Sequence, residues 1–210
     1  MGFYPLFADV SGRSCVVIGG GAIAEGKVRG LLAAGAHVIV ISPTLTEPLA
    51  VAARDGRITH RSRVYTDGDL DGATLAFAAT GDAVINAAAA AEGRRLGVWV
   101  NAVDDPAHCD FIVPAVLRRG ALAVAVSTGG ASPALAAVVR EELEHHLGGD
   151  YAALVDVAAE VRRTLRTERQ RVDATTWRRA LADPGFRRLV REGRRALASR
   201  RLRARLEQPA

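Results

Sequence analysis

Apolar residues in the first 130 positions fall into short continuous runs, which alternate with segments where apolar residues recur every three or four positions. The first pattern is typical of buried strands and the second of helices. The expected helices are 22–35, 45–56, with Pro48 in its first turn, and 82–97. The expected strands are 14–20, 37–42, 57–65, 75–80, 98–103 and 122–128. Continuous rather than alternating apolar strands indicate a sheet covered on both faces. The pattern therefore predicts an α/β fold, a Rossmann-type doubly wound and mostly parallel sheet.

The pattern becomes helical after residue 131. Ser132 and Pro133 are a favoured N-cap and first helical residue for a helix that ends near Gly148. Segments 151–170 and 186–206 follow as amphipathic helices. A helical pair needs a neighbour to bury its apolar stripe, so we expect a homodimer. The predicted regions are a Rossmann domain (1–115), a central strand–helix dimerisation segment (116–147) and a helical domain (148–210).

Composition places the chain among globular proteins. Its 210 residues, of which 49% are hydrophobic, suffice for one or two domains with a buried core. No apolar stretch approaches the roughly 20 residues of a membrane span, and the start lacks the features of a signal peptide. Cys15 and Cys109 have no metal-type spacing and are expected to be reduced. We therefore expect a cytoplasmic protein without a membrane partner.

The net charge of +5 is unevenly distributed along the chain. Residues 162–205 contain 16 arginines and 4 acids, whereas the rest has 12 basic and 19 acidic residues, a net charge of −7. Such a basic segment suits a solvated helical face, an anionic small molecule or nucleic acid. No nucleic-acid motif or interleaved aromatic residue supports the last of these, so no nucleic-acid partner is expected.

A glycine-rich turn is the first candidate binding site. Gly19-x-Gly21-x-x-Ala24 follows an expected strand and opens an expected helix. In that context Gly19 allows the tight turn, Gly21 the approach of a pyrophosphate, and Ala24 the packing of helix on strand. The pattern predicts dinucleotide binding at the helix N-terminus.

The second strand lacks the acid that usually binds the ribose of NAD. Ser42, Pro43 and Thr44 stand at its end, and the first carboxylate is Glu47. Hydroxyl or backbone groups there can bind ribose, or the segment is an ordinary turn. The motif alone therefore leaves the choice between NAD and NADP open.

Polar residues follow three later strands. Thr80 either contacts a cofactor or caps the next helix, as Asp82 also can. Asp104 follows strand 98–103, where a carboxylate with a like-charged neighbour can guide a proton, whereas Asp105 before Pro106 suits a turn. The segment from Ser127 to Gly130 either holds a substrate carboxylate or acts as a hinge. His108, Cys109 and Asp110 are consecutive and cannot ordinarily converge on one ion, so no metal site is assigned.

Taken together, these motifs resemble the precorrin-2 dehydrogenase and sirohydrochlorin ferrochelatase family, the oxidase–chelatase part of siroheme synthase. The resemblance rests on ordered motifs over about residues 3–145 and, more loosely, on the helical end. The motifs are YPLF (4–7), VVIGGGAIAEGK (16–27), AAT with Asn86 after it, VNAVDDPAHCDFIVPA and VSTGGASPALA.

The resemblance implies that NAD accepts hydride from precorrin-2, an anionic tetrapyrrole, and that sirohydrochlorin forms. It makes Asp104 the catalytic carboxylate and places Ser127 and Thr128 near the substrate. Cofactor contacts carry over to Gly21, Ala22, Ile23, Pro43 and Thr44. Some relatives also insert ferrous ion as a substrate, and no residue here decides whether this chain does.

Two other functions fit parts of the pattern. A hydroxyacid dehydrogenase needs a catalytic His or Lys in a larger substrate domain, and none is apparent. An NAD-binding regulatory or sensor module with a helical dimer would bind nucleotide but would not need Asp104. Substitution of Asp104 distinguishes this last alternative from the dehydrogenase.

Overall fold

The computed structural model describes residues 2–103 and 105–207, which form two compact units. The first unit ends at Val113 and the second begins at Pro114. We expected the Rossmann domain to end at residue 115, two residues beyond the end of the first unit. Each unit has its own hydrophobic core. Their internal structures are described separately below.

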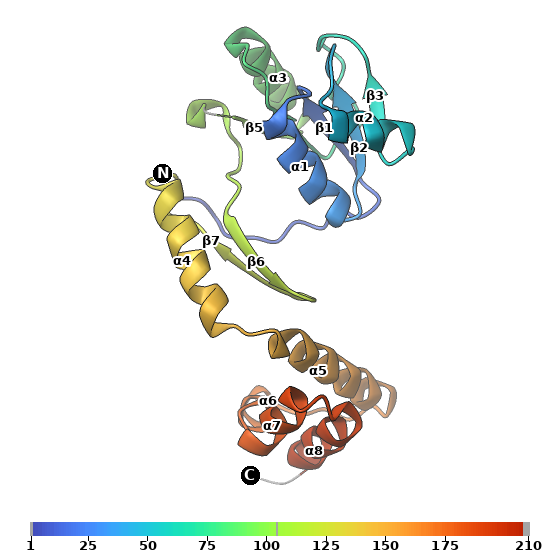
Figure 1. The fold of residues 1–210 in the computed structure, drawn as a ribbon, viewed down its shortest axis with the longest axis vertical. Helices are drawn as coiled ribbons and strands as arrows, with labels where there is room; N and C mark the ends of the chain where they lie inside the picture. The colour runs from blue at the N-terminus through green and yellow to red at the C-terminus, as the bar shows by residue number, and fades with distance from the viewer. Residues whose placement is uncertain (1, 104, 208–210) are drawn as a thin grey trace. The chain divides into compact units, whose positions relative to one another are not determined.

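The first unit is built on a five-stranded parallel sheet (Figure 1). The strand order is β3-β2-β1-β4-β5, so the order reverses between β1 and β4. The strands are β1 (Ser14–Ile18), β2 (His37–Ile41), β3 (Thr59–Arg61), β4 (Leu75–Ala78) and β5 (Trp99–Ala102). This arrangement confirms the predicted Rossmann-type fold, in which ligands bind at the carboxyl edge where the strand order reverses.

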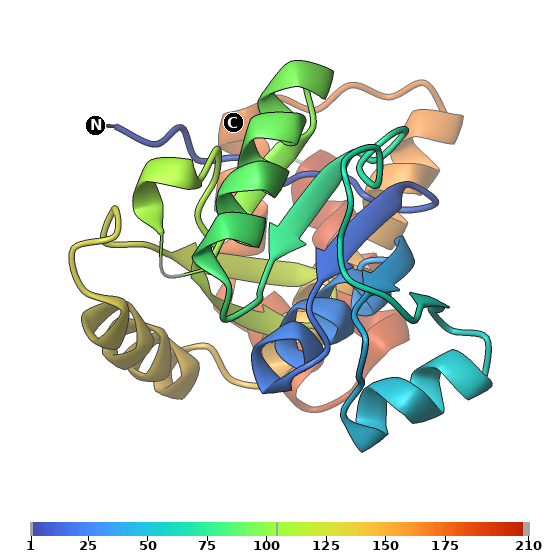
Figure 2. The ribbon, with the colours of Figure 1, turned by 90° about the horizontal axis from the view of Figure 1, so that it is seen from above.

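Helices cover both faces of this sheet, as the continuous apolar strands predicted (Figure 2). On β1, Val17 packs with α1 and α2, whereas Val16 and Ile18 belong to the opposite core with α3. The helices are α1 (Ala22–Ala33), α2 (Glu47–Arg54) and α3 (Ala83–Leu96), followed by a short 3-10 helix, η1 (Pro106–His108). Alternate residues of β1, β2 and β4 thus belong to different cores.

The predicted third strand is much shorter than expected. Only Thr59–Arg61 pairs with β2, because the following residues turn to surround the buried Asp69. Arg63 binds both Asp69 oxygens at 2.6 Å, and Arg61 binds one at 2.8 Å. These ion pairs hold the pKa of Asp69 well below its usual range. The polar loop therefore ends the strand.

The predicted sixth strand does not belong to the parallel sheet. β7 (Leu122–Val126) pairs antiparallel with β6 (Ala115–Arg119), in a separate two-stranded sheet. Only two residues join them, and so short a connection permits a hairpin but not a crossover between parallel strands. The prediction for 122–128 was correct as to a strand and wrong as to its sheet, and β6 was not predicted.

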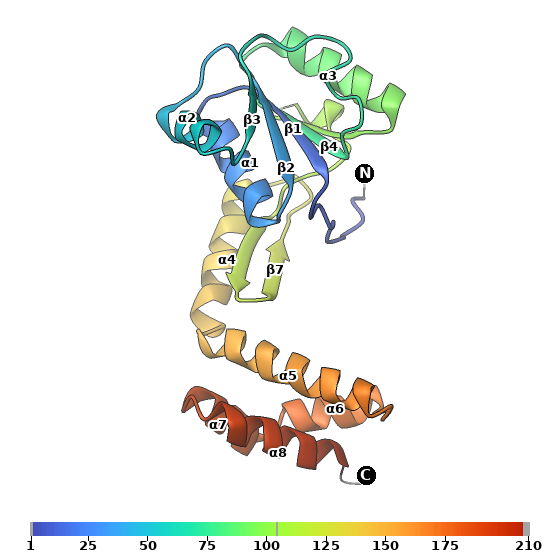
Figure 3. The ribbon, with the colours of Figure 1, turned by 90° about the vertical axis from the view of Figure 1, so that its right-hand side faces the viewer.

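The second unit continues as helices (Figure 3). They are α4 (Pro133–His146), α5 (Asp150–Thr167), α6 (Ala174–Leu181), α7 (Pro184–Arg191) and α8 (Arg195–Glu207). Ser132 caps α4 by accepting a hydrogen bond from the Leu135 N–H at 3.2 Å, as predicted. α4 packs on β6 and β7, whereas α5 to α8 share one core.

At the helical end, one expected helix was wrong, and one reason for expecting a homodimer is removed, while the homodimer itself stays a prediction. The single helix expected over 186–206 is two helices, because Gly193 adopts a positive φ of 68° between them. The apolar stripe of α5, with Leu154, Val157 and Val161 buried, needs no second copy of the chain because it packs in one core with α6, α7 and α8. Among the described residues, no helix combines the length and apolar character of a transmembrane span.

Replacing Asp183 with asparagine is expected to destabilise the second unit by about 2–4 kcal/mol. The carboxylate is buried, caps α7 through the Phe186 N–H at 2.7 Å, and pairs with Arg201 and Arg205. These contacts lower its pKa. Its stabilisation is therefore complete above about pH 5 and is lost as the pH falls below the ordinary aspartate pKa of about 3.9 toward the lower folded value.

Urea unfolding followed by Trp177 fluorescence in a Trp99→Phe background measures this effect at pH 7 and pH 3. Asp183→Asn should remove much of the pH dependence. The control is Asp156→Asn, because Asp156 is an exposed acid of the same helical core and contacts Arg195 only at 3.9 Å. Equal stabilities of the two variants at pH 7 would contradict the role assigned to Asp183.

Candidate functional site

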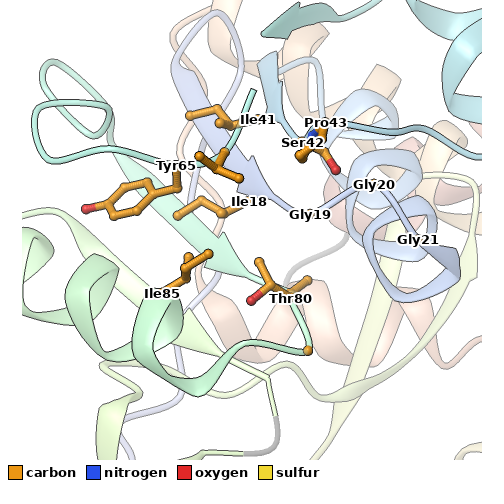
Figure 4. Close-up of a pocket in the computed structure, with 13 residues that line it drawn as sticks. Ile18, Gly19, Gly20, Gly21, Ile41, Ser42, Pro43, Tyr65, Thr80 and Ile85 are labelled. Carbon is orange, nitrogen blue, oxygen red and sulfur yellow. The ribbon is translucent and has the colours of Figure 1, made fainter. Parts of the chain in front are cut away.

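A pocket of about 300 Å³ lies at the carboxyl edge of the sheet, where the strand order reverses (Figure 4). It is lined by the turn after β1, the ends of β2 and β4, the loop after β3 and the first turns of α3. Of the predicted cofactor residues, Gly19, Gly21, Pro43 and Thr80 line it, whereas Ala22, Ile23 and Thr44 do not. No charged residue is among its described lining residues.

The glycine turn is shaped by close backbone packing. Gly19 has a φ of 114°, and a Cβ there would collide with the carbonyl oxygen of Ala79 at the end of β4. A Cβ on Gly20 would collide with the Thr44 carbonyl oxygen. Thr44 therefore supports the turn with its backbone. Both glycines are required for the turn itself, whatever binds beside it.

Gly21 differs from its two neighbours. It is exposed, and a Cβ there would have no atom within 4 Å. It is the N-cap residue of α1, which receives no side-chain cap among the described residues. Ala22 and Ile23 begin this helix, so their N–H groups belong to the turn that lacks intrahelical acceptors. Open space beside an uncapped helix N-terminus is the arrangement that fits a dinucleotide pyrophosphate.

The end of β2 forms the second wall of the pocket. Ser42 is buried, and its carbonyl oxygen lies 2.9 Å from His60 Nε2. Pro43 lines the pocket beside Ser42. There is thus no carboxylate for a ribose diol and no cation for a 2′-phosphate among the described lining residues.

Thr80 lines the pocket and also organises the start of α3. Its hydroxyl accepts a hydrogen bond from the Asp82 N–H at 3.0 Å and contacts Asn86 Oδ1 at 3.1 Å. Asp82 is the N-cap residue, which accepts from the N–H groups of Val84 and Ile85. The capping interpretation is therefore correct for Asp82, whereas Thr80 supports the cap residue rather than the helix itself. A cofactor contact by Thr80 remains a prediction.

Sequence reasoning missed the wall formed by the loop after β3. Val64 and Tyr65 line the pocket, and the Tyr65 hydroxyl donates to the buried Glu92 of α3. Burial and this carboxylate raise the pKa of Tyr65. Glu92 also accepts the N–H groups of Gly68 and Leu70 at 2.9 and 3.0 Å. A glutamate in an alanine-rich helix was the available signal, but its partners lie more than 20 residues away in sequence.

The segment that follows β5 folds back onto that strand. The Asp110 carboxylate accepts the Val100 N–H at 2.8 Å, and the Cys109 thiol donates to the Ala102 carbonyl at 3.1 Å. Burial raises the pKa of Cys109. Asp105 lies 2.6 Å from His108 Nδ1. These structural contacts account for the cluster, and the described residues contain no group of three or more potential metal ligands.

Asp104, the predicted catalytic carboxylate, lies outside the described residues. The predicted substrate residues Ser127 and Thr128 lie in the second unit, after β7. The Ser127 hydroxyl accepts from the Gly129 N–H at 3.1 Å, and the Thr128 hydroxyl accepts from the Ser132 N–H at 2.9 Å. Both thus stabilise the turn into α4, and their contact with substrate remains a prediction.

Comparison with known proteins identifies the family. Residues 6–115 match a family described as "Putative NAD(P)-binding", and residues 119–146 match one described as "Sirohaem biosynthesis protein central". The chain belongs to the first of these, the putative NAD(P)-binding family, whose match covers more than half of it. The first match covers the whole parallel sheet and its pocket, and the second covers β7 and α4.

Individual relatives agree with this assignment. A siroheme synthase of Azotobacter vinelandii is 39% identical over 98% of this chain and 45% of its own length. A siroheme synthase of Methylobacillus flagellatus is 43% identical over 77% of this chain and 35% of its own. The chain thus spans less than half the length of these relatives. The solved structure of SirC, a precorrin-2 dehydrogenase, superposes with a TM-score of 0.73 at 25% identity and covers 94% of this chain and 99% of its own.

Proposed function

We propose that this protein oxidises precorrin-2 to sirohydrochlorin with NAD as the oxidant. The observation that supports this most is the open space at Gly21, beside the uncapped start of α1, in a chain that matches siroheme synthases and a precorrin-2 dehydrogenase. Precorrin-2 loses a hydride and a proton in this reaction, and the products are sirohydrochlorin, NADH and H⁺. NAD, when bound, supplies the acceptor for the hydride.

The chain's own groups would hold the dinucleotide. The N–H groups at the start of α1 would bind the pyrophosphate beside Gly21, and Ser42 and Pro43 would contact the adenosine end. The pocket's apolar walls at Ile18 and Ile85 would exclude water. None of the described lining residues is a cation, which favours NAD over NADP because a 2′-phosphate is usually bound by arginine.

Asp104 would take the proton that leaves the macrocycle. It follows β5, whose carboxyl end lies next to that of β4 at the edge that carries the pocket. A carboxylate at such an edge is suited to general base catalysis. The reaction would take place in the cytoplasm, where the free thiols of Cys15 and Cys109 would stay reduced.

The direct test is anaerobic incubation of the purified protein with enzymatically made precorrin-2, with and without NAD. Sirohydrochlorin absorbance should rise only with NAD. Addition of ferrous ion to the same cuvette then measures whether the protein also accelerates metal insertion. Absence of NAD-dependent oxidation by folded protein that binds NAD would contradict the proposal.

We also propose a homodimer formed through the α4 face. Leu135 and Val138 on α4 and Val116 on β6 are exposed by 53%, 49% and 38%, respectively. Exposed apolar side chains that lie three residues apart on one helix face suit an interface. The proposed partner is a second copy of this chain.

Changing Leu135 and Val138 to glutamate is expected to convert the dimer to monomer at micromolar concentration. Two buried like charges on each copy would face the partner across the interface. Light scattering coupled to size-exclusion chromatography measures the mass. The matched control places two glutamates at the exposed Ala196 and Ala204 of α8. A wild-type monomer, or dimers of equal stability in both variants, would refute this interface.

A further inference from the structure

A second, larger pocket lies within the helical part of the second unit. Its volume is about 1050 Å³, just above the range of roughly 300–1,000 Å³ that is usual for small-molecule sites. It lies between α5 and α6, which both pack against α8. Eight of its 13 lining residues are apolar, and half-buried Trp177 is the largest of them. We call this pocket the α5–α6 groove.

Four arginines line the α5–α6 groove, namely Arg162, Arg166, Arg171 and Arg178. All four are exposed, and no carboxylate is among the described lining residues. They also make no ion pair with any residue that the structure describes. The groove thus combines an apolar floor with uncompensated positive charge.

The other face of this helical core is different. Among the described residues, four of the five α8 arginines are paired with acids, including Arg195 with Glu160 at 3.1 Å and Arg203 with Glu168 at 2.7 Å. Glu160 and Glu168 belong to α5 or its end and are paired with α8. Asp173, between the lining residues Val172 and Ala174, caps α6 through the N–H groups of Thr175 and Thr176. Most α8 arginines are thus paired with acids, whereas the four arginines that line the groove form no ion pair among the described residues.

Helical spacing explains how the groove receives both kinds of side chain. Val155, Arg162 and Arg166 lie at intervals of seven and four along α5, which places them on one face. Trp177 and Arg178 of α6 line the same groove. Arginine guanidinium groups bind carboxylates in pairs of hydrogen bonds and stack on flat rings, and tryptophan offers a further stacking surface.

We propose that the α5–α6 groove binds a flat, apolar macrocycle that carries several carboxylates, namely the tetrapyrrole of the proposed reaction. The macrocycle would lie on Trp177 and the apolar floor, and its carboxylates would pair with the four arginines. The identity of this ligand rests on the proposed function, whereas its planar and polyanionic character follows from the groove itself. The groove would thereby hold substrate or product by a site distinct from the pocket at Gly21.

The test uses the full chain with Trp99→Phe, so that Trp177 is the only tryptophan, and uroporphyrin as a stable polycarboxylate probe. Porphyrin should quench Trp177 fluorescence saturably, and more weakly as salt rises. Changing Arg162 and Arg166 to glutamine should raise Kd by about tenfold or more, because two charge-assisted contacts are lost. The matched control changes Arg163 and Arg179, exposed arginines of the same helices outside the groove, and should raise Kd by less than about threefold.

Equal Kd values for the groove variant and the control would overturn the proposal. A change of mass in the groove variant alone would also overturn it, because the groove would then be an interface between copies. So would a short single-stranded oligonucleotide that binds the groove more tightly than porphyrin does. Precorrin-2 oxidation by the wild-type chain is measured in parallel. If the wild-type chain oxidises precorrin-2 but the groove variant binds porphyrin as tightly as the control, only the groove proposal is refuted. If the groove variant loses porphyrin affinity but the wild-type chain oxidises no precorrin-2, the groove proposal is supported and only the proposed function is refuted.

Discussion

Replacing Asp104 with asparagine is expected to lower kcat for precorrin-2 oxidation by about 100- to 10,000-fold, the usual contribution of a general base. Asparagine has nearly the same shape but cannot accept the proton that must leave the macrocycle. The Kd for NAD should change by less than about threefold, because the dinucleotide contacts are proposed at the glycine turn and β2. Anaerobic initial rates and fluorescence titration with NADH measure the two quantities.

Asp105→Asn is the matched control, since it removes the adjacent charge, which instead contacts His108 at 2.6 Å. Its kcat should fall by less than about tenfold. Unchanged turnover in Asp104→Asn would refute the assignment of that acid. A protein that binds NAD but oxidises no precorrin-2 in either form would instead favour the alternative of a regulatory nucleotide sensor.

Replacing Gly21 with valine is expected to weaken NAD binding by about a hundredfold, or about 2.7 kcal/mol, while the fold persists. Its φ of −89° suits any residue, and a Cβ there meets no protein atom within 4 Å. The new side chain therefore occupies the space that the pyrophosphate needs. Isothermal titration with NAD gives the affinity, and thermal unfolding gives the stability.

Gly19→Ala gives the opposite pattern and serves as the comparison. Its φ of 114° and the nearby Ala79 carbonyl leave no room for a Cβ. We expect a destabilisation of more than about 1 kcal/mol. Normal NAD affinity in Gly21→Val would contradict the proposed cofactor position, and a fold lost in Gly21→Val but not in Gly19→Ala would contradict the steric account of the turn.

Local patterns were sufficient to predict much of the first unit. The runs at 14–20 and 37–42 are apolar on successive residues because each strand contributes to two cores, and this signal is contained within the strand itself. The glycine turn was equally readable, since Gly19 and Gly21 are placed relative to a strand and a helix that adjoin them in sequence. Four of the seven predicted cofactor residues consequently line the pocket.

The features that were missed depend on distant partners or on chain connectivity. The polar loop that shortens β3 is fixed by Asp69 and by Glu92, and Glu92 lies 27 residues beyond Tyr65. Strand 122–128 has the composition of a core strand, and only the two-residue connection to β6 excludes it from the parallel sheet. Likewise, amphipathic periodicity in α5 cannot reveal whether its stripe is buried by its own chain or by a second copy.

The most direct test of the central claim is the stoichiometry of the reaction. A catalytic amount of protein is mixed anaerobically with precorrin-2 and excess NAD, and NADH and sirohydrochlorin are quantified in the same samples over time. The proposed hydride transfer predicts equal molar amounts of the two products throughout, and neither product with protein that carries Asp104→Asn. Sirohydrochlorin formed without matching NADH, or no sirohydrochlorin from protein that binds NAD, would contradict the account.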